Sequence, residues 1–201
     1  FFQIWLNLPR EKKMVDPHFK MFWSESFSEQ TPISGLRVRC IAGEMTGFKP
    51  PSPPPNSWAS LTPSSFAIWL IDMEPGVNWT LPVTPKGAHR SLYAVNGESI
   101  SLNGYDLPKR HAAFIKDQRD VVLSSRTQSA SLLLLQGEPI GEPVVQYGPF
   151  VMNSKAEIRQ AYLDYQRTGF GGWPWQRDDP VHDREQGRFA MHSDGRMDMP
   201  S

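Results

Sequence analysis

Hydrophobic and polar residues alternate over short stretches of this 201-residue chain, which is the pattern of half-buried β-strands. The clearest case is residues 36–43, where apolar side chains on one side alternate with two arginines on the other. Similar stretches predict further strands over residues 21–27, 66–73, 79–81, 91–95, 98–102, 112–115, 121–123 and 131–135. Many short strands at this spacing predict an all-β sandwich or small barrel.

Two Asn-Gly pairs lie between the predicted strands in the middle of the chain. They are Asn96-Gly97 and Asn103-Gly104, and each adjoins alternating apolar residues. Asparagine and glycine tolerate the positive φ of a type I′ turn. We therefore predict a tight hairpin at each pair.

The first nine residues, FFQIWLNLP, also alternate and predict a strand that ends at Pro9. A polar connector follows over residues 10–20. Because the sequence opens inside an apolar segment without Met, two interpretations arise: a trimmed N-terminus, or a preceding domain that is missing. The alternation favours the second, since such a strand needs partners.

One helix is predicted, beginning after Ser154. Ser154 and Glu157 have the spacing of a capping box, and apolar side chains follow Ile158 at i+4 and i+7. Gly169 is well placed to end the helix. Beyond it lie the aromatic segment FGGWPW, residues 170–175, and a polar tail, residues 176–201.

A proline-rich run, KPPSPPP, occupies residues 49–55. Prolines at this density exclude a helix or a central strand and favour an extended surface stretch. The run is either a docking ligand for a proline-binding module or a stiff loop that braces the next strand, and we favour the loop.

Charge and cysteine content narrow the possible partners. The 21 basic and 21 acidic residues balance, so no global field recruits nucleic acid or an anionic membrane. No apolar run approaches the roughly 20 residues that span a bilayer. Cys40 is the single cysteine, which excludes an intrachain disulfide and fits a reducing, cytoplasmic location.

Metal-binding and nucleophilic motifs are absent from the sequence. The five histidines form no H-x-H or H-E-x-x-H motif, and they are His18, His89, His111, His182 and His192. His89 and His111 could converge within the β region, although solvent-facing histidines are the favoured interpretation. His182 and His192 lie among acidic residues of a tail that we interpret as solvated.

Cys40 falls on the apolar side of its strand, which favours a buried, inert thiol. No G-x-S-x-G elbow or P-loop occurs.

The run GEPIGEPVVQYGPFVMN, residues 137–153, carries a family resemblance. The wider stretch, residues 132–166, resembles the C-terminal signature of the pirins. Residues 3–9 resemble the last strand of the first pirin domain, and the tail resembles an extension of bacterial members.

This resemblance implies half of a bicupin, a protein of two packed β-barrels. The family's iron ligands, three His and one Glu, belong to the first barrel, before the segment that matches residues 3–9. We therefore predict no catalytic, cofactor-binding or metal-binding residue in this chain. In the second barrel the corresponding cupin slot is GAHRSLY, residues 87–93, which keeps one histidine, His89, and neither the second histidine nor the glutamate.

The expected fold is all-β: a cupin-type double-stranded β-helix, or jelly-roll barrel, with one C-terminal α-helix and an irregular tail. Residues 1–20 are predicted as the last strand of the missing N-terminal cupin plus a connector. Residues 21–147 are predicted as the metal-free C-terminal barrel, and residues 148–201 as the helix with its aromatic and polar tail.

The expected function has two levels. The resemblance implies an iron-dependent parent protein, a quercetin 2,3-dioxygenase or a redox-linked regulator, in which this chain is the non-catalytic second barrel. Its expected partner is the missing N-terminal cupin, and neither nucleic acid nor membrane is expected. The alternative is a non-enzymatic protein-interaction or regulatory module.

Overall fold

A computed structural model describes residues 1–45, 47–62, 65–97, 99–116, 119–178 and 182–200. The chain forms two compact units. One comprises residues 26–139, and the other comprises residues 1–25 together with 140–201. They are described in turn.

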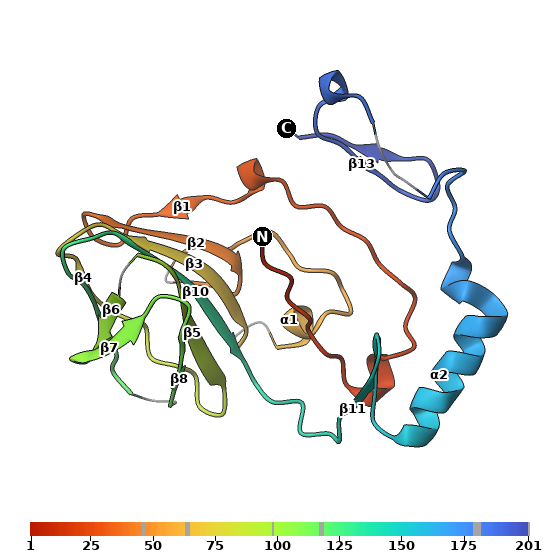
Figure 1. The fold of residues 1–201 in the computed structure, drawn as a ribbon, viewed down its shortest axis with the longest axis horizontal. Helices are drawn as coiled ribbons and strands as arrows, with labels where there is room; N and C mark the ends of the chain where they lie inside the picture. Colours follow the sequence, from red (N-terminus) through yellow and green to blue (C-terminus); the bar gives the residue numbers. More distant parts are fainter. Residues whose placement is uncertain (46, 63–64, 98, 117–118, 179–181, 201) are drawn as a thin grey trace. The chain divides into compact units, whose positions relative to one another are not determined.

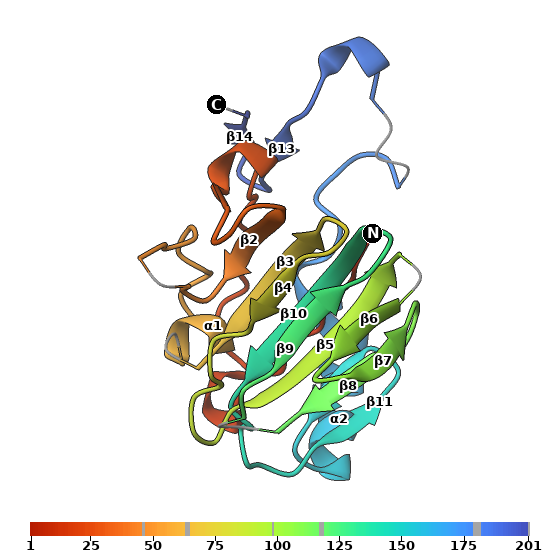
Figure 2. The ribbon, with the colours of Figure 1, turned by 90° about the vertical axis from the view of Figure 1, so that its left-hand side faces the viewer.

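The first unit contains a six-stranded antiparallel sheet with the order β1-β2-β3-β10-β5-β8. Figure 2 shows its central strands side by side. The strands are β1 (Glu29–Gln30), β2 (Leu36–Ala42), β3 (Ala67–Met73), β10 (Ala130–Gly137), β5 (His89–Asn96) and β8 (Ala112–Ile115).

A four-stranded antiparallel sheet forms the second layer of this unit, with the order β4-β9-β6-β7. Figure 1 shows β4, β6 and β7 of this sheet. Its strands are β4 (Asn78–Thr80), β9 (Val122–Ser125), β6 (Ser99–Leu102) and β7 (Tyr105–Pro108). The core contains fully buried side chains from both sheets, including Ile71, Leu92, Leu134 and Leu123. The predicted all-β, cupin-type fold is confirmed as a β-sandwich whose sheets do not close into a barrel.

Strand β2 shows the predicted alternation. Leu36, Val38 and Cys40 are 0% exposed, whereas Arg37 is exposed. Burial raises the pKa of the Cys40 thiol to about 11. The thiol is therefore protonated at neutral pH, as expected of an inert core cysteine.

The two Asn-Gly pairs have different roles. Asn103 and Gly104 have φ values of 47° and 89° and join the paired strands β6 and β7, so this hairpin prediction is confirmed. The hairpin predicted at Asn96-Gly97 is wrong, because β5 pairs with β10 and β8 whereas β6 belongs to the other sheet. Gly97 instead allows a close crossing, since a Cβ there would lie 2.6 Å from the Ser129 carbonyl oxygen. Glu98, which the predicted strand included, lies outside the described residues.

The proline-rich run ends in a short helix, α1 (Trp58–Leu61). The Ser60 hydroxyl donates a hydrogen bond to the Pro54 carbonyl at 2.7 Å, and Ser57 caps α1. Pro50, Pro51, Pro53 and Pro54 are half-buried. The run therefore contacts this helix, which the sequence pattern did not predict.

The second unit contains the predicted helix, α2 (Lys155–Thr168), beside a hairpin of β11 (Val145–Tyr147) and β12 (Phe150–Met152). The Ser154 hydroxyl accepts a hydrogen bond from the Glu157 amide at 3.2 Å. Gly169 ends the helix in the left-handed region with φ 57°. Both predicted caps of α2 are therefore confirmed.

Two strand predictions near the start of the chain are wrong. Residues 1–9 form no strand within the part of the chain that the structure describes, and a 3-10 helix, η1 (Arg10–Lys12), follows them. Residues 21–27 contain a second 3-10 helix, η2 (Ser24–Ser26). An alternating pattern becomes a strand only where another backbone edge accepts its hydrogen bonds, and neither segment is paired in this way over the described residues.

The tail contains more order than predicted. It includes η3 (Gly169–Gly171), η4 (Arg184–Gln186) and a small hairpin of β13 (Ala190–Met191) and β14 (Met197–Asp198). Arg188 forms an ion pair with Glu25, which lowers the pKa of the Glu25 carboxyl to about 2. Among the helices in the described ranges, none is long and apolar enough to cross a membrane.

Candidate functional site

A pocket of about 390 Å³ opens at one end of the first unit. The end of β10, the starts of β3 and β5 and the loop after β4 meet there. Its inner walls include Phe66, Trp69, Arg90 and Gln136, all of which are at most 8% exposed. Glu44 lies at the exposed rim.

Arg90 is the only buried guanidinium in the described part of the chain, and it is 3% exposed. It lies on the same side of β5 as the core residues Leu92 and Ala94. Its Nε and Nη2 donate to Gln136 Oε1 at 2.9 and 2.5 Å, and its Nη1 donates to the Pro82 carbonyl at 2.6 Å. Arg90 and Gln136 are direct cross-strand partners of β5 and β10.

Gln136 is fixed in orientation by a further contact, because its Nε2 donates to the Ser65 carbonyl at 2.9 Å. The amide therefore presents its oxygen to Arg90. Gln136 is neutral, however, and so leaves the guanidinium charge without a counter-ion. Burial lowers the pKa of Arg90 to about 10, which still leaves the side chain cationic at neutral pH.

The carboxylate nearest in the pocket lining is engaged elsewhere. Glu44 Oε1 lies 3.3 Å from Lys49 Nζ, and the Glu44 side chain is 58% exposed. Trp69 is 3% exposed, and its Nε1 is enclosed by protein without a hydrogen-bond partner within the described ranges. The pocket therefore contains a buried cation, and the Trp69 ring contributes part of its wall.

These residues do not fit a metal ion. A cation would meet the positive charge of Arg90, and the inward-facing side chains supply neither an imidazole nor a carboxylate. His89, the one histidine of the cupin slot, is exposed on the other face of β5. Over the described residues, no group of three or more His, Cys, Asp and Glu side chains could hold a metal.

The alternative site of His89 and His111 is not formed. His89 begins β5, whereas the His111 carbonyl accepts a hydrogen bond from Ala94 at the far end of that strand. Five residues of strand separate the two positions by roughly 16 Å. In the tail, His192 Nε2 contacts Asp198 Oδ2 at 2.7 Å, while Asp179, one of the acidic residues near His182, lies outside the described residues.

The second unit has a larger, mainly apolar pocket of about 770 Å³. It is formed by the extended N-terminal segment, the β11–β12 hairpin and α2, with Trp5, Leu6 and Phe150 among its lining residues. Trp5 is 59% exposed, Phe2 is 47% exposed, and Phe1 is fully exposed. This unit therefore carries an incompletely covered apolar surface.

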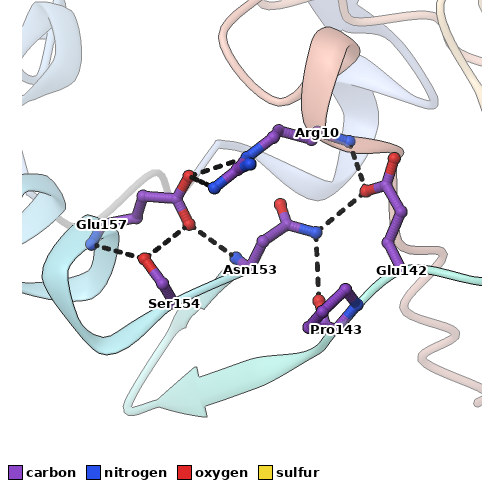
Figure 3. Close-up of polar contacts among 6 residues, drawn as sticks. All are labelled: Arg10, Glu142, Pro143, Asn153, Ser154 and Glu157. Carbon is purple, nitrogen blue, oxygen red and sulfur yellow. Dashed lines mark hydrogen bonds and ion pairs between the residues drawn. The ribbon is translucent and has the colours of Figure 1, made fainter.

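A polar network fixes the N-terminal segment beside this pocket (Figure 3). The backbone amide of Arg10 donates to Glu142 Oε2 at 2.7 Å, and the Arg10 guanidinium donates to Glu157 Oε1 at 2.7 and 3.0 Å. Asn153 links the two carboxylates: its Nδ2 donates to Glu142 at 2.8 Å, and its amide donates to Glu157 at 3.1 Å. Hydrogen bonds from Arg10 and Ser154 lower the pKa of Glu157.

Replacing Asn153 with alanine is expected to lower the free energy of unfolding by about 1–3 kcal/mol, because the Nδ2 bonds to Glu142 and to the Pro143 carbonyl are both lost. Urea unfolding measures this change. Asn56→Ala, at a turn in the other unit, is the control and should change stability by less than about 0.5 kcal/mol. Equal effects of the two substitutions would contradict the assigned role of Asn153.

The profile of the pirin C-terminal cupin domain matches residues 68–171, which is more than half of the chain. The chain belongs to the pirin family. Arabidopsis thaliana Pirin-1 is 36% identical over 84% of this chain and 57% of its own length, and human pirin is 31% identical over 84% and 56%.

Solved structures agree with the pirin fold. A quercetin 2,3-dioxygenase from Acinetobacter baumannii has a TM-score of 0.71 and 27% identity, covering 83% of this chain and 55% of that protein. This pirin chain thus spans about half the length of the relatives that it matches.

The pirin signature includes Glu142, Pro143 and Asn153, all of which belong to the network around Arg10. In this chain, these signature residues hold the N-terminal segment and start α2. They do not line the pocket of the first unit.

Sequence reasoning missed the Arg90–Gln136 pair, although a signal was present. Arg90 has the same strand parity as Leu92 and Ala94, and Gln136 has the same parity as Leu134. Each of these polar residues therefore falls on the core-facing side of its own strand. Two such positions indicate a buried polar pair.

Proposed function

We propose that this chain is the metal-free second barrel of a pirin-type bicupin, and that the two-cupin protein cleaves quercetin-like flavonols with iron held by the other cupin. The observation that carries the proposal is the family match, because it assigns the sandwich to the C-terminal pirin domain. The quercetin 2,3-dioxygenase among the structural relatives supports the reaction class.

The inner face of the sandwich supports the proposal that the other cupin holds the iron. The inward-facing side chains at this end of β5 and β10 include Arg90, Leu92 and Gln136. A metal-binding cupin needs histidines and a carboxylate instead. A cation in this position opposes metal binding. Iron chemistry therefore falls to the partner cupin, and this chain contributes packing surface.

The partner surface belongs to the second unit. Phe2, Trp5 and Leu6 are at least 38% exposed, and they lie in a segment that the Arg10 network holds in a defined conformation. A metal-bearing cupin would cover these side chains, and burial of their apolar area would stabilise the assembly by roughly 25 cal/mol per Å².

Quercetin turnover tests the proposal. This chain alone, supplied with Fe²⁺ under air, is expected to consume flavonol no faster than the same Fe²⁺ without protein. A two-cupin protein that carries this chain as its second half is expected to turn quercetin over. Turnover by this chain alone, abolished by His89→Ala, would overturn the assignment.

A further inference from the structure

The pocket of the first unit has a charge that its own residues do not balance. Of the five N–H groups of the Arg90 guanidinium, three donate to Gln136 and the Pro82 carbonyl. None of these acceptors carries a negative charge. Burying a cation without a counter-ion is costly, and the usual solution in proteins is an anion supplied by a side chain or a ligand.

The remaining donors and the pocket walls restrict the ligand. Two Arg90 N–H groups and the Trp69 indole N–H have no acceptor within the described part of the chain. Trp69 lines the same pocket and is itself more than nine-tenths buried. Planar guanidinium donors match the two oxygens of a carboxylate, whereas the Trp69 Nε1 is enclosed by protein and its ring serves as pocket wall.

The other walls are apolar, and the size suits a small organic molecule. Phe66, Pro82 and Pro85 line the pocket, whose volume is about 390 Å³. Pockets of this volume fall within the range that holds small-molecule ligands. Glu44 at the rim is paired with Lys49, so Arg90 is the one uncompensated charge of the lining, and it matches a ligand with a single negative charge.

We propose that this pocket binds a small monocarboxylate with an apolar or aromatic body, its carboxylate paired with Arg90 and its body against Phe66 and the prolines. The pocket shares no lining residue with the partner surface proposed above. Its existence does not depend on that surface or on the iron chemistry. It gives the metal-free barrel a ligand-binding role of its own.

Titration of the 201-residue chain with benzoate tests the site, followed by the indole N–H resonances of its seven tryptophans in NMR spectra. Trp69→Phe identifies the Trp69 resonance by its disappearance. Benzoate is expected to shift that resonance in a saturable way, because the Trp69 ring lines the pocket. Inorganic phosphate at the same concentration is expected to bind at least tenfold more weakly.

Benzoate affinities of three single variants test which side chains contribute to binding. Arg90→Lys keeps the charge but loses the planar fork, and it is expected to weaken benzoate binding roughly tenfold to a hundredfold. His89→Gln, on the opposite face of the same strand, is the matched control and should bind benzoate as the unmodified chain does. Glu44→Gln is expected to bind benzoate equally or more tightly.

Three results would overturn the assignment. They are the absence of saturable binding at 10 mM benzoate, equal binding by the Arg90→Lys variant, and tighter binding of phosphate than of benzoate. If Arg90→Lys does not fold, Phe66→Leu replaces it, and tryptophan fluorescence measures the affinity. Unchanged affinity in Phe66→Leu would then contradict the proposed contact of the ligand body with Phe66.

Discussion

Replacing Gly43 with alanine is expected to lower the free energy of unfolding by about 2–5 kcal/mol. Gly43 follows β2 with φ 78°, and a Cβ there would lie 1.9 Å from the Phe66 carbonyl oxygen and 2.7 Å from the Ala67 Cα. Left-handed backbone costs a residue with a side chain about 1–2 kcal/mol, and overpacking adds about 1–3 kcal/mol. The contacting atoms are backbone, so they cannot rotate away.

Gly47 provides the matched control, because its φ is 79° and nothing lies within 4 Å of the position of a Cβ. Gly47→Ala should therefore cost only the conformational part, about 1–2 kcal/mol. Urea unfolding of both variants separates the two contributions. Equal destabilisation by the two substitutions would show that the close approach at Gly43 has no energetic weight. Because Phe66 and Ala67 line the pocket, we also expect Gly43→Ala to weaken benzoate binding.

Replacing Gln136 with leucine is expected to destabilise the chain by about 3–5 kcal/mol, because it leaves the buried Arg90 charge with one acceptor, the Pro82 carbonyl. The Ser65 carbonyl also loses its donor. Hydrogen bonds to a charged group contribute about 1.5–3 kcal/mol each, so this variant loses more than a neutral pair would. Chemical unfolding at neutral pH, where Arg90 is charged, measures the loss.

The double variant Arg90→Met with Gln136→Leu isolates the cause of that loss. It removes the charge and its acceptor together while keeping similar volume, and we expect it to recover most of the stability. A double variant that is as unstable as the sum of the single variants would show that the two side chains act independently. In that case the buried pair would have no special energetic role.

Local patterns in the sequence predicted much of the fold. Strands β2, β3 and β10 and helix α2 have the expected limits to within a few residues, because their side-chain periodicity, caps and burial agree. Asn103-Gly104 likewise determines its turn through its own backbone preferences.

Features that depend on distant partners were not predictable in the same way. Residues 1–9 alternate like a strand, yet no neighbouring backbone edge pairs with them among the described residues. Asn96-Gly97 has the sequence of a hairpin turn, but the strands on either side belong to different sheets. The choice of partner strand is made by packing across the sandwich, which a local pattern does not contain.

The same reasoning applies to the candidate site. The sequence predicted a cupin slot at residues 87–93 with one histidine. That Arg90 faces Gln136 required the register between β5 and β10, which only the structure provides. The sequence therefore indicated what the pocket lacks, and the structure shows which residues occupy it.

Iron stoichiometry tests the central claim most directly. The purified chain is incubated with excess Fe²⁺ under anaerobic conditions, desalted and analysed for iron by elemental analysis. The metal-free assignment predicts far less than one iron per chain, with the same value in His89→Ala. One iron per chain that survives desalting, and is lost in His89→Ala, would contradict it.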